Sequence, residues 1–469
     1  MKKLGFIAAC VAASFMTQAA AQPAPVAPAP ISADMQRTLD QLREAGLKDD
    51  NAYAIVEDLV SRIGPREAGS EAEARARDWA VAMLRTQGFN NSRIEPFTIP
   101  SWDATVETAE VITPAHQRLV IAALGGSAPT PAGGLEAEVV RFTSLDALQA
   151  APDASVRGKI VFIDEGMTRT QDGSGYGVAV RKRGACTPMA QAKGAVACLI
   201  RSVATDASRF PHQGGPSRQR DNAHLPNAAL AVPDADVLAY LIAHGPGPVR
   251  VRLNIETTTN DAAPSGNVIA EIPGRDRGGE VVLAVAHLDS WDLGYGAIDD
   301  GAGVAIVTAA AKLIRDLPRR PRRTIRILLA GSEEIGGKGG EAYAAAHEHD
   351  THIVAAESDF GADRVWRVQT NFGVGAMPYA RALQLQLAPL GVNPGDNNAD
   401  PGTDVDPVKA QGVPVITLNQ DGTRYFDVHH TANDTLARID REQLRQNVAA
   451  WAVFLYMAAD SDWDFRKTE

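Results

Sequence analysis

The chain has 469 residues, of which 45% are hydrophobic, and its formal net charge at pH 7 is -11. A chain of this length usually divides into more than one domain, and its hydrophobic share is sufficient for a large core. The acidic balance argues against a nucleic-acid partner and offers no polybasic segment for a membrane surface.

The first 21 residues are predicted to be a secretory signal peptide. Met1-Lys2-Lys3 precedes the apolar stretch Leu4–Met16, and Ala19-Ala20-Ala21 offers a small-residue cleavage site. A lipoprotein box ending at Cys10 is the alternative, although the apolar run before that cysteine is short. No later stretch reaches the ~18 uninterrupted apolar residues of a membrane span. We therefore expect an exported protein, periplasmic or secreted, without a membrane span.

Export would leave two cysteines, Cys186 and Cys198. An oxidising compartment permits a disulfide between them. Two buried thiols are the alternative, because Cys198 lies in an apolar run and Cys186 in the helix-like stretch before it. Neither cysteine has a second cysteine or a histidine at zinc-finger spacing.

Residues 22–32 are rich in proline and alanine and are expected to form an extended leader. Helices are predicted around Met35–Leu47 and Ser70–Gln87. The second has apolar residues at helical spacing and stops at Gly88, and its opening Ser-Glu-Ala-Glu is typical of a capping box.

Residues 103–260 differ in their pattern of predicted secondary structure from the sequence on either side. Short β-like runs alternate with turns, and helices are expected near Gly184–Lys193 and Asp234–His244. The expected strands are 138–142, 159–163, 195–200, 228–232 and 249–255. Neither clustered acids nor paired histidines occur here, and 202–224 is expected to be an irregular loop. We predict a separately folded, β-rich inserted domain that covers or borders the functional site without supplying metal ligands.

Residues 33–102 and 261–469 are predicted to form one discontinuous α/β domain. After residue 267, apolar runs typical of buried strands alternate with helical patterns. The expected strands are 268–272, 281–286, 325–330, 353–356 and 413–418. One helix is expected around 304–314, and the last begins at Asp440.

Acids and histidines recur just beyond four of these strands. They are His287 and Asp289, Glu333 and Glu334, Asp359 and, in the loop beyond the last strand, His430. Asp299 and Asp300 begin a helix after a glycine-rich loop. Open α/β sheets place their sites beyond the carboxyl ends of strands. Each group alone would be an ordinary surface feature, but their ordered recurrence at strand ends favours a single site.

Histidine and carboxylate side chains are the ligands that zinc prefers, apart from cysteine. A pair of ions requires two histidines and three acids if each ion has one histidine, one terminal carboxylate and one shared carboxylate. The candidates are His287, His430, Glu334, Asp359 and bridging Asp299.

Two further residues have candidate roles in the chemistry. Glu333 is adjacent to a ligand, and as a general base it would take a proton from water and pass it to the leaving amine. Asp289 follows His287 by two residues and would hydrogen-bond the other ring nitrogen, which fixes the tautomer.

Other motifs fit less well. In the histidine-rich stretch 347–352, the residue where a zincin motif needs its second histidine is Thr351, so we interpret it as a solvated helix end. The Gly-x-Ser-x-Gly frame of a nucleophile elbow and a phosphate-binding glycine loop are both absent.

The chain resembles the M28 family of co-catalytic zinc peptidases. The stretches that carry the resemblance are His287–Asp292, Gly296–Gly303, Ser332–Glu334, Glu357–Gly361 and His429–Thr435. Gly184–Ser202 looks like part of a protease-associated domain. The resemblance spans nearly all of the mature chain and implies a three-layer αβα zinc-exopeptidase sheet with an inserted, protease-associated-like domain.

The family pattern implies the same roles, residue by residue. Zinc would be bound by His287, Asp299, Glu334, Asp359 and His430, with Asp299 bridging and Glu333 as the base. Asp300 would follow Asp299 through a cis peptide. Two features depart from the pattern, the long 202–224 loop and Arg424-Tyr425-Phe426, and both are candidates to line the substrate pocket.

The expected function is exopeptidase cleavage of dipeptides and short peptides with two zinc ions per chain. Carboxypeptidase or dipeptidase action is favoured, and aminopeptidase action is the alternative. A non-catalytic receptor-like protein and a single-zinc, glutaminyl-cyclase-like enzyme are less favoured, because all five ligands and the base are present. Several family members are homodimers, so a homodimer is a further expectation.

Overall fold

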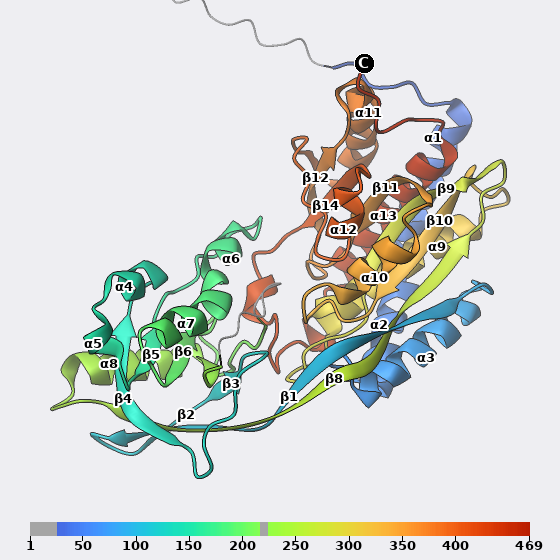
Figure 1. The fold of residues 1–469 in the computed structure, drawn as a ribbon. Helices are drawn as coiled ribbons and strands as arrows, with labels where there is room; N and C mark the ends of the chain where they lie inside the picture. The colour runs from blue at the N-terminus through green and yellow to red at the C-terminus, as the bar shows by residue number, and fades with distance from the viewer. Residues whose placement is uncertain (1–25, 216–223) are drawn as a thin grey trace, which may run out of the picture.

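The computed structural model describes residues 26–215 and 224–469 (Figure 1). The predicted signal peptide and the first residues of the leader lie outside the described residues. Within those two ranges, no helix combines the length and the apolar character that crossing a membrane requires.

Fourteen strands form one continuous sheet in the described chain. The strands are β1 Arg93–Thr113, β2 Gln117–Leu119, β3 Ile121–Ala123, β4 Leu135–Phe142, β5 Ile160–Ile163, β6 Ala197–Arg201, β7 Asn227–Leu230, β8 Arg250–Ile272, β9 Arg277–His287, β10 Arg323–Ala330, β11 Thr351–Glu357, β12 Val365–Asn371, β13 Asn393–Pro394 and β14 Val415–Gln420. Their order is β13-β12-β14-β11-β9-β10-β8-β4-β5-β6-β7-β3, and β1 pairs with β2 and β8.

Thirteen α-helices accompany these strands in the described ranges. They are α1 Ala33–Gly46, α2 Asn51–Arg62, α3 Glu71–Thr86, α4 Leu145–Ala150, α5 Asp153–Val156, α6 Ser174–Ala179, α7 Arg181–Ala192, α8 Val232–His244, α9 Ala302–Arg315, α10 Lys338–Ala346, α11 Met377–Leu387, α12 Asp406–Ala410 and α13 Arg441–Asp460. The predicted cap at Ser70 and the predicted start of the last helix at Asp440 are both confirmed, and the two side chains accept hydrogen bonds from the first turns of α3 and α13.

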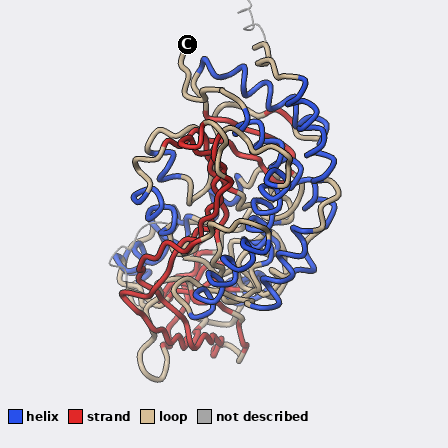
Figure 2. The backbone as a smooth tube through the Cα atoms, turned by 90° about the vertical axis from the view of Figure 1, so that its right-hand side faces the viewer, coloured by secondary structure: helices blue, strands red, loops and turns tan. Residues whose placement is uncertain are grey.

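The half of the sheet from β8 to β14 is covered on both faces. Strand side chains alternate between faces, so Val282 and Ala284 of β9 pack with α9 and α13, whereas Leu283 and Val285 pack with α10 and α12. Figure 2 shows helices on either side of the strands. The predicted three-layer αβα arrangement of this part is confirmed, and it matches the apolar runs of β9, β10 and β11.

Two long strands connect this half of the sheet to the rest of the molecule. In Figure 1, β1 and β8 run as an antiparallel pair from the α3 side toward the green segment that contains α4 to α8. Residues 268–272 of β8 pair with β10, and residues 250–253 pair with β4. The predicted boundaries near 103 and 260 therefore fall inside continuous strands.

The segment between these boundaries has its own apolar clusters and contains more helix than expected. Strands β4, β5, β6 and β7 are parallel neighbours, with helices α4 to α7 between them in the chain and α8 after β7. Buried residues of these strands pack among themselves and against α7 and α8. We name residues 103–260 the inserted segment, and its independent folding stays a prediction.

Cys186 of α7 and Cys198 of β6 form a disulfide in the inserted segment. Both side chains are buried, and their Cα atoms are 6.4 Å apart. Of the two alternatives that the sequence left open, the structure has the bridge.

Replacing both cysteines with serine should lower the free energy of unfolding by about 3 kcal/mol, because a short cross-linked loop constrains the unfolded chain. Calorimetry of the double variant beside the parent measures this loss. Turnover per folded molecule should stay unchanged, since the bridge is not among the clustered acids and histidines. Lost turnover at full metal content would contradict a purely structural role.

Candidate metal centre

The predicted site residues converge at one edge of the sheet. Strands β9, β10 and β11 are parallel, so their carboxyl ends lie together. His287 ends β9, Glu333 and Glu334 follow β10, and Asp359 follows β11. The remaining two come from loops: Asp299 lies in the segment Ala297–Gly301, where its own backbone is extended rather than helical, and His430 lies beyond β14.

Five of these side chains form two triads that share Asp299. Nε2 of His287 is 3.1 Å from Oδ1 of Asp299 and 3.4 Å from Oδ1 of Asp359. Nε2 of His430 is 3.2 Å from Oδ2 of Asp299 and 3.0 Å from Oε2 of Glu334. Two ligand atoms bound tetrahedrally to one zinc are roughly 3.3 Å apart. Each histidine therefore lies at ligand spacing from Asp299 and from one further carboxylate, and Asp299 offers a different oxygen to each histidine. Among the described residues of this cluster, ligand atoms within 4.8 Å of one another also occur in three other combinations: His287, Asp299 and Glu334; His287, Asp300 and Asp359; and Asp299, His429 and His430.

Unsatisfied oxygen atoms in this cluster also fit a bound cation. Oδ2 of Asp299, Oε1 of Glu334 and Oδ1 of Asp359 are buried and accept no hydrogen bond from the described chain. Buried carboxylate oxygens without a partner are unfavourable, since they lose their hydration. Metal coordination would satisfy all three, so the donor set is compatible with zinc.

The electrostatics of the cluster reflect the crowding of acids. Burial would raise the pKa of Asp299, but the imidazole groups of His287 and His430 beside it outweigh this effect and hold that pKa well below its usual range. Burial holds the pKa of Glu333 well above its ordinary value. His287 opposes this rise, and the nearby charges of Asp359 and Glu334 add to it.

Asp289 links the histidine of β9 to the glutamate pair after β10. Its carboxylate accepts hydrogen bonds from the main-chain N–H groups of Glu333, at 3.0 Å, and Glu334, at 3.2 Å. Nδ1 of His287 lies 3.0 Å from the main-chain oxygen of Asp289 and 3.7 Å from its Oδ1. The short contact expected from the Asp289 side chain is thus made by its main chain, and the side chain orients the glutamates.

Two residues with positive φ frame the centre. Ser332 has φ 65° and His430 has φ 61°, and they are the two non-glycine residues in the left-handed region among those described. This conformation costs a non-glycine residue on the order of 1–3 kcal/mol. The Ser332 hydroxyl is held by Ser265, at 2.8 Å. The turn at Ser332 directly precedes Glu333 and Glu334 and sets their direction.

Asp434 holds the loop of the shared carboxylate, and the sequence motifs did not single it out. Its carboxylate accepts hydrogen bonds from the main-chain N–H groups of Ala297, Ile298 and Asp299, at 2.9, 2.6 and 3.1 Å. Asp300 accepts from the N–H of His287, at 3.1 Å. The cis peptide implied between Asp299 and Asp300 is confirmed.

Arg66 also holds the loop that carries Asp299. This arginine is fully buried and donates to the main-chain oxygens of Leu288, Tyr295 and Gly296. A buried guanidinium is tolerable when carbonyl oxygens surround it. Because its partners are main-chain atoms, no residue pattern in the sequence points to this role.

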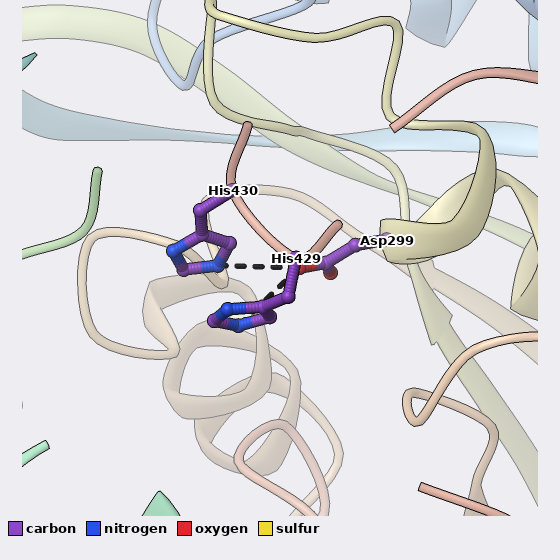
Figure 3. Close-up of side chains that lie close together, drawn as sticks. All are labelled: Asp299, His429 and His430. Atoms are coloured by element: carbon purple, nitrogen blue, oxygen red, sulfur yellow. Dashed lines mark ion pairs between the residues drawn. The ribbon is translucent and has the colours of Figure 1, made fainter. Parts of the chain in front are cut away.

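His429 is a third histidine at the centre. Figure 3 shows it beside His430 and Asp299. The two imidazole rings stack with centroids 3.5 Å apart, and Nε2 of His429 is 3.6 Å from Oδ2 of Asp299. Burial lowers the pKa of His429 well below its usual value, and the neighbouring His430 adds to this effect. His430 lies nearer to Asp299 and also contacts Glu334, so its geometry is the better fit for a ligand.

The inserted segment contacts both histidines. Nδ1 of His430 lies 3.1 Å from the main-chain oxygen of Gln213, and the N–H of Gln213 donates to the His430 carbonyl oxygen, also at 3.1 Å. The Tyr176 ring stacks on Phe426 at 4.6 Å and meets the His429 ring edge-on at 5.4 Å. The inserted segment therefore borders the centre, and the two triads contain none of its described residues.

Arg169 joins the inserted segment to the loop of the two histidines. Its guanidinium binds both carboxylate oxygens of Asp427, at 2.6 and 2.9 Å, and contacts the main-chain oxygens of Thr205 and Thr423. Bidentate pairing of this kind fixes orientation as well as distance. It secures the chain two residues before His429.

A cavity of about 90 Å³ lies between the segments that follow β11 and β14. Ile298, Phe360, Arg424 and Tyr425 are among the residues that line it. Arg424 and Tyr425 thus line a cavity, and that this cavity is the substrate pocket stays a prediction. Separately, Glu67, Asp103 and Asp292 form a partly exposed acidic group, where burial together with the neighbouring acids raises the pKa of Glu67 to about 9.

Known proteins are similar to this chain in sequence and in fold. Residues 267–455 match the family model of peptidase family M28. Carboxypeptidase Q of Bos taurus is 34% identical over 430 residues, which cover 91% of this chain and 89% of that protein. The crystal structure of a peptidase M28 precursor from Shewanella amazonensis is 44% identical, with a TM-score of 0.90, and the match covers 92% of this chain and 98% of that one.

A more distant structure shares the fold. BSAP, a zinc aminopeptidase from Bacillus subtilis, is 21% identical, with a TM-score of 0.65, and the match covers 89% of this chain and 98% of that one. The fold and the clustered ligands together define a metal-dependent hydrolase. The chain belongs to peptidase family M28. The resemblance inferred from the motifs is thereby confirmed.

Asp434→Asn should reduce zinc affinity by about 10–100-fold, since the amide replaces one oxygen that holds the Asp299 loop. Competition with a chromogenic chelator measures the affinity. Asp462→Asn, an exposed aspartate distant from the cluster in sequence, is the control and should bind zinc as the parent does. Equal affinity in both variants would show that Asp434 does not position Asp299.

Proposed function

We propose that this chain is an exported exopeptidase that uses two zinc ions to hydrolyse a terminal bond of dipeptides and short peptides. Carboxypeptidase or dipeptidase action is the favoured mode. One observation carries the proposal: His287 and His430 contact different oxygens of Asp299, and each also contacts one further carboxylate. A second ion requires such a bridge, and a single-ion site does not.

The triads divide the ligands between the two ions. His287 and Asp359 would hold one ion, His430 and Glu334 would hold the other, and Asp299 would contact both. When bound, zinc polarises a carbonyl group and lowers the pKa of water. The residues then have to place the scissile bond and move a proton.

Glu333 is suited to move that proton. It follows a fixed turn, belongs to neither triad, and its carboxyl group lies close enough to His287 and Asp359 to feel their charges. Its carboxylate would accept the proton that the attacking water loses and donate it to the nitrogen of the departing amine or amino acid. The carboxylate of Asp289 would keep Glu333 in position through the main-chain hydrogen bond.

The choice of peptide end rests on similarity. The relative at 34% identity bears the name carboxypeptidase, whereas the zinc aminopeptidase from Bacillus subtilis is 21% identical. Aminopeptidase action is therefore the alternative. A receptor-like or single-zinc, cyclase-like protein is disfavoured, because the second triad and its bridge would have no use.

Export is supported by the N-terminal sequence pattern and by the disulfide between Cys186 and Cys198, since such bonds persist in oxidising compartments. The homodimer rests on family resemblance alone. Light scattering of the purified protein would measure its mass in solution, and a monomer would rule the homodimer out.

Glu334→Gln and Glu333→Gln should each lose activity, but for different reasons. Loss of a ligand should lower zinc content and activity together in Glu334→Gln. Glu333→Gln should keep two zincs and bind substrate, but its kcat should fall by a factor of about 10²–10⁴ through loss of general-base catalysis. Metal analysis with steady-state kinetics on both variants tests this. If Glu333→Gln loses zinc and Glu334→Gln retains it, the two roles are reversed.

Metal content and end-blocked substrates test the function itself. Two zincs per chain are expected, against one for a cyclase-like enzyme and none for a receptor. Free dipeptides should be cleaved faster than the same dipeptides with an amidated carboxyl end. If amine blocking abolishes cleavage while carboxyl blocking leaves it unchanged, the aminopeptidase alternative is correct.

A further inference from the structure

Arg183 is a buried cation whose hydrogen bonds are incomplete. It lies in α7 of the inserted segment, and only 4% of its surface is exposed. Nη1 donates to the Tyr176 hydroxyl at 3.1 Å. Its Nε and Nη2 atoms are buried without a hydrogen-bond partner in residues 26–215 and 224–469. An arginine so placed lacks acceptors for a charge that has left water.

The two unpaired nitrogens are the pair that binds a carboxylate side-on. In a planar guanidinium, the N–H of Nε and one N–H of Nη2 point in the same direction and match the two oxygens of a carboxylate. Nη1, on the other side, is the nitrogen already used by Tyr176. Tyr176 therefore holds Nη1. The N–H groups of Nε and Nη2, which we call the Nε–Nη2 fork, have no acceptor among the described residues.

Arg183 borders the metal centre along two routes. Its partner Tyr176 meets the ring of His429 at 5.4 Å. On another side, a Cβ atom at Gly214 would lie 2.5 Å from Nη1 of Arg183, so the guanidinium packs against the main chain of the 202–215 loop. The residue before Gly214 is Gln213, whose main chain is bonded to His430.

His212 adds a second polar group at this place. It is fully buried, and neither ring nitrogen has a hydrogen-bond partner among the described residues. The nearest acid recorded for it is Asp206, with Oδ1 at 3.7 Å from Nε2. His212 lies two residues before Gly214, which packs against Arg183, and directly before Gln213, whose main chain contacts His430.

We propose that the Nε–Nη2 fork of Arg183 binds the free α-carboxylate of the peptide substrate, with His212 as a second donor. The inference rests on the proposed exopeptidase function and assigns its direction. The acids of the centre would offset the charge of the bound ions, so a basic side chain outside the centre is the natural partner for a substrate carboxylate. The inserted segment supplies the positive charge that such a substrate needs, and it would make the enzyme specific for unblocked carboxyl ends.

The test compares one dipeptide with its C-terminal amide. In the parent protein, kcat/KM should favour the free acid. Arg183→Gln should lower kcat/KM for the acid by about 10–100-fold, the usual effect of losing hydrogen bonds to a charged group. Most of the loss should appear in KM, and the amide should be cleaved as before. Inhibition by a free amino acid and by its amide gives the same comparison if the amide is not turned over.

Three controls separate specificity from damage to the fold. Arg181→Gln changes an exposed arginine two residues earlier in the same helix and should behave as the parent. Arg183→Lys keeps the charge without the fork and should recover only part of the loss. Zinc content and melting temperature of each variant report whether the centre and the fold are intact.

The outcomes distinguish failure of this inference from failure of the proposed function on which it rests. Equal losses on acid and amide would show that Arg183 is structural and overturn the proposal. A loss confined to substrates with an acidic side chain would assign the fork to that side chain and also overturn it. If the parent cleaves both forms equally and Arg183→Gln changes nothing, the inference fails while the peptidase stands. If the zinc-loaded parent cleaves no dipeptide, the proposed function fails.

Discussion

The carboxylate of Asp299 is the group on which the rest of the centre depends. Its two oxygens face two histidines that are brought together from β9 and from the loop after β14. That arrangement works only if the loop of Asp299 is held in place, which Asp434 and the buried Arg66 do through main-chain hydrogen bonds. The parallel strands supply the remaining ligands at a common edge, so sheet topology and bridging geometry depend on each other.

The sequence predicted the parts of this arrangement that are local. Apolar runs predicted β9, β10 and β11, and an acid or histidine directly after a parallel strand must lie at its carboxyl edge. The contributions of Asp434, Arg66 and Gln213 were not predictable, since each bonds main-chain atoms far away in sequence. Strand β12 was missed because arginine and glutamine interrupt its apolar residues, and the boundaries near 103 and 260 were placed inside strands that continue through them.

The inserted segment contributes to the centre although neither triad uses its described residues. Gln213 holds the ring of His430, Tyr176 packs on His429, and Arg169 binds Asp427 just before these histidines. The left-handed backbone of His430 is unfavourable by itself. It persists because the inserted segment holds the His430 loop on one side and the half of the sheet from β8 to β14 holds it on the other.

Charge is distributed unevenly between the two parts of the chain at this site. The half of the sheet from β8 to β14 presents carboxylates, and three of the candidate ligands among them have buried oxygens without a hydrogen-bond donor. The inserted segment presents Arg183, with two buried N–H groups that lack an acceptor among the described residues. Unsatisfied groups of opposite sign at neighbouring positions are unfavourable alone and favourable when each meets its complement. A metal ion complements the first set and a substrate carboxylate the second. A peptide bound between the metal ions and Arg183 would therefore have one orientation. The long strand pair β1 and β8 connects the two parts of the chain that supply these contacts.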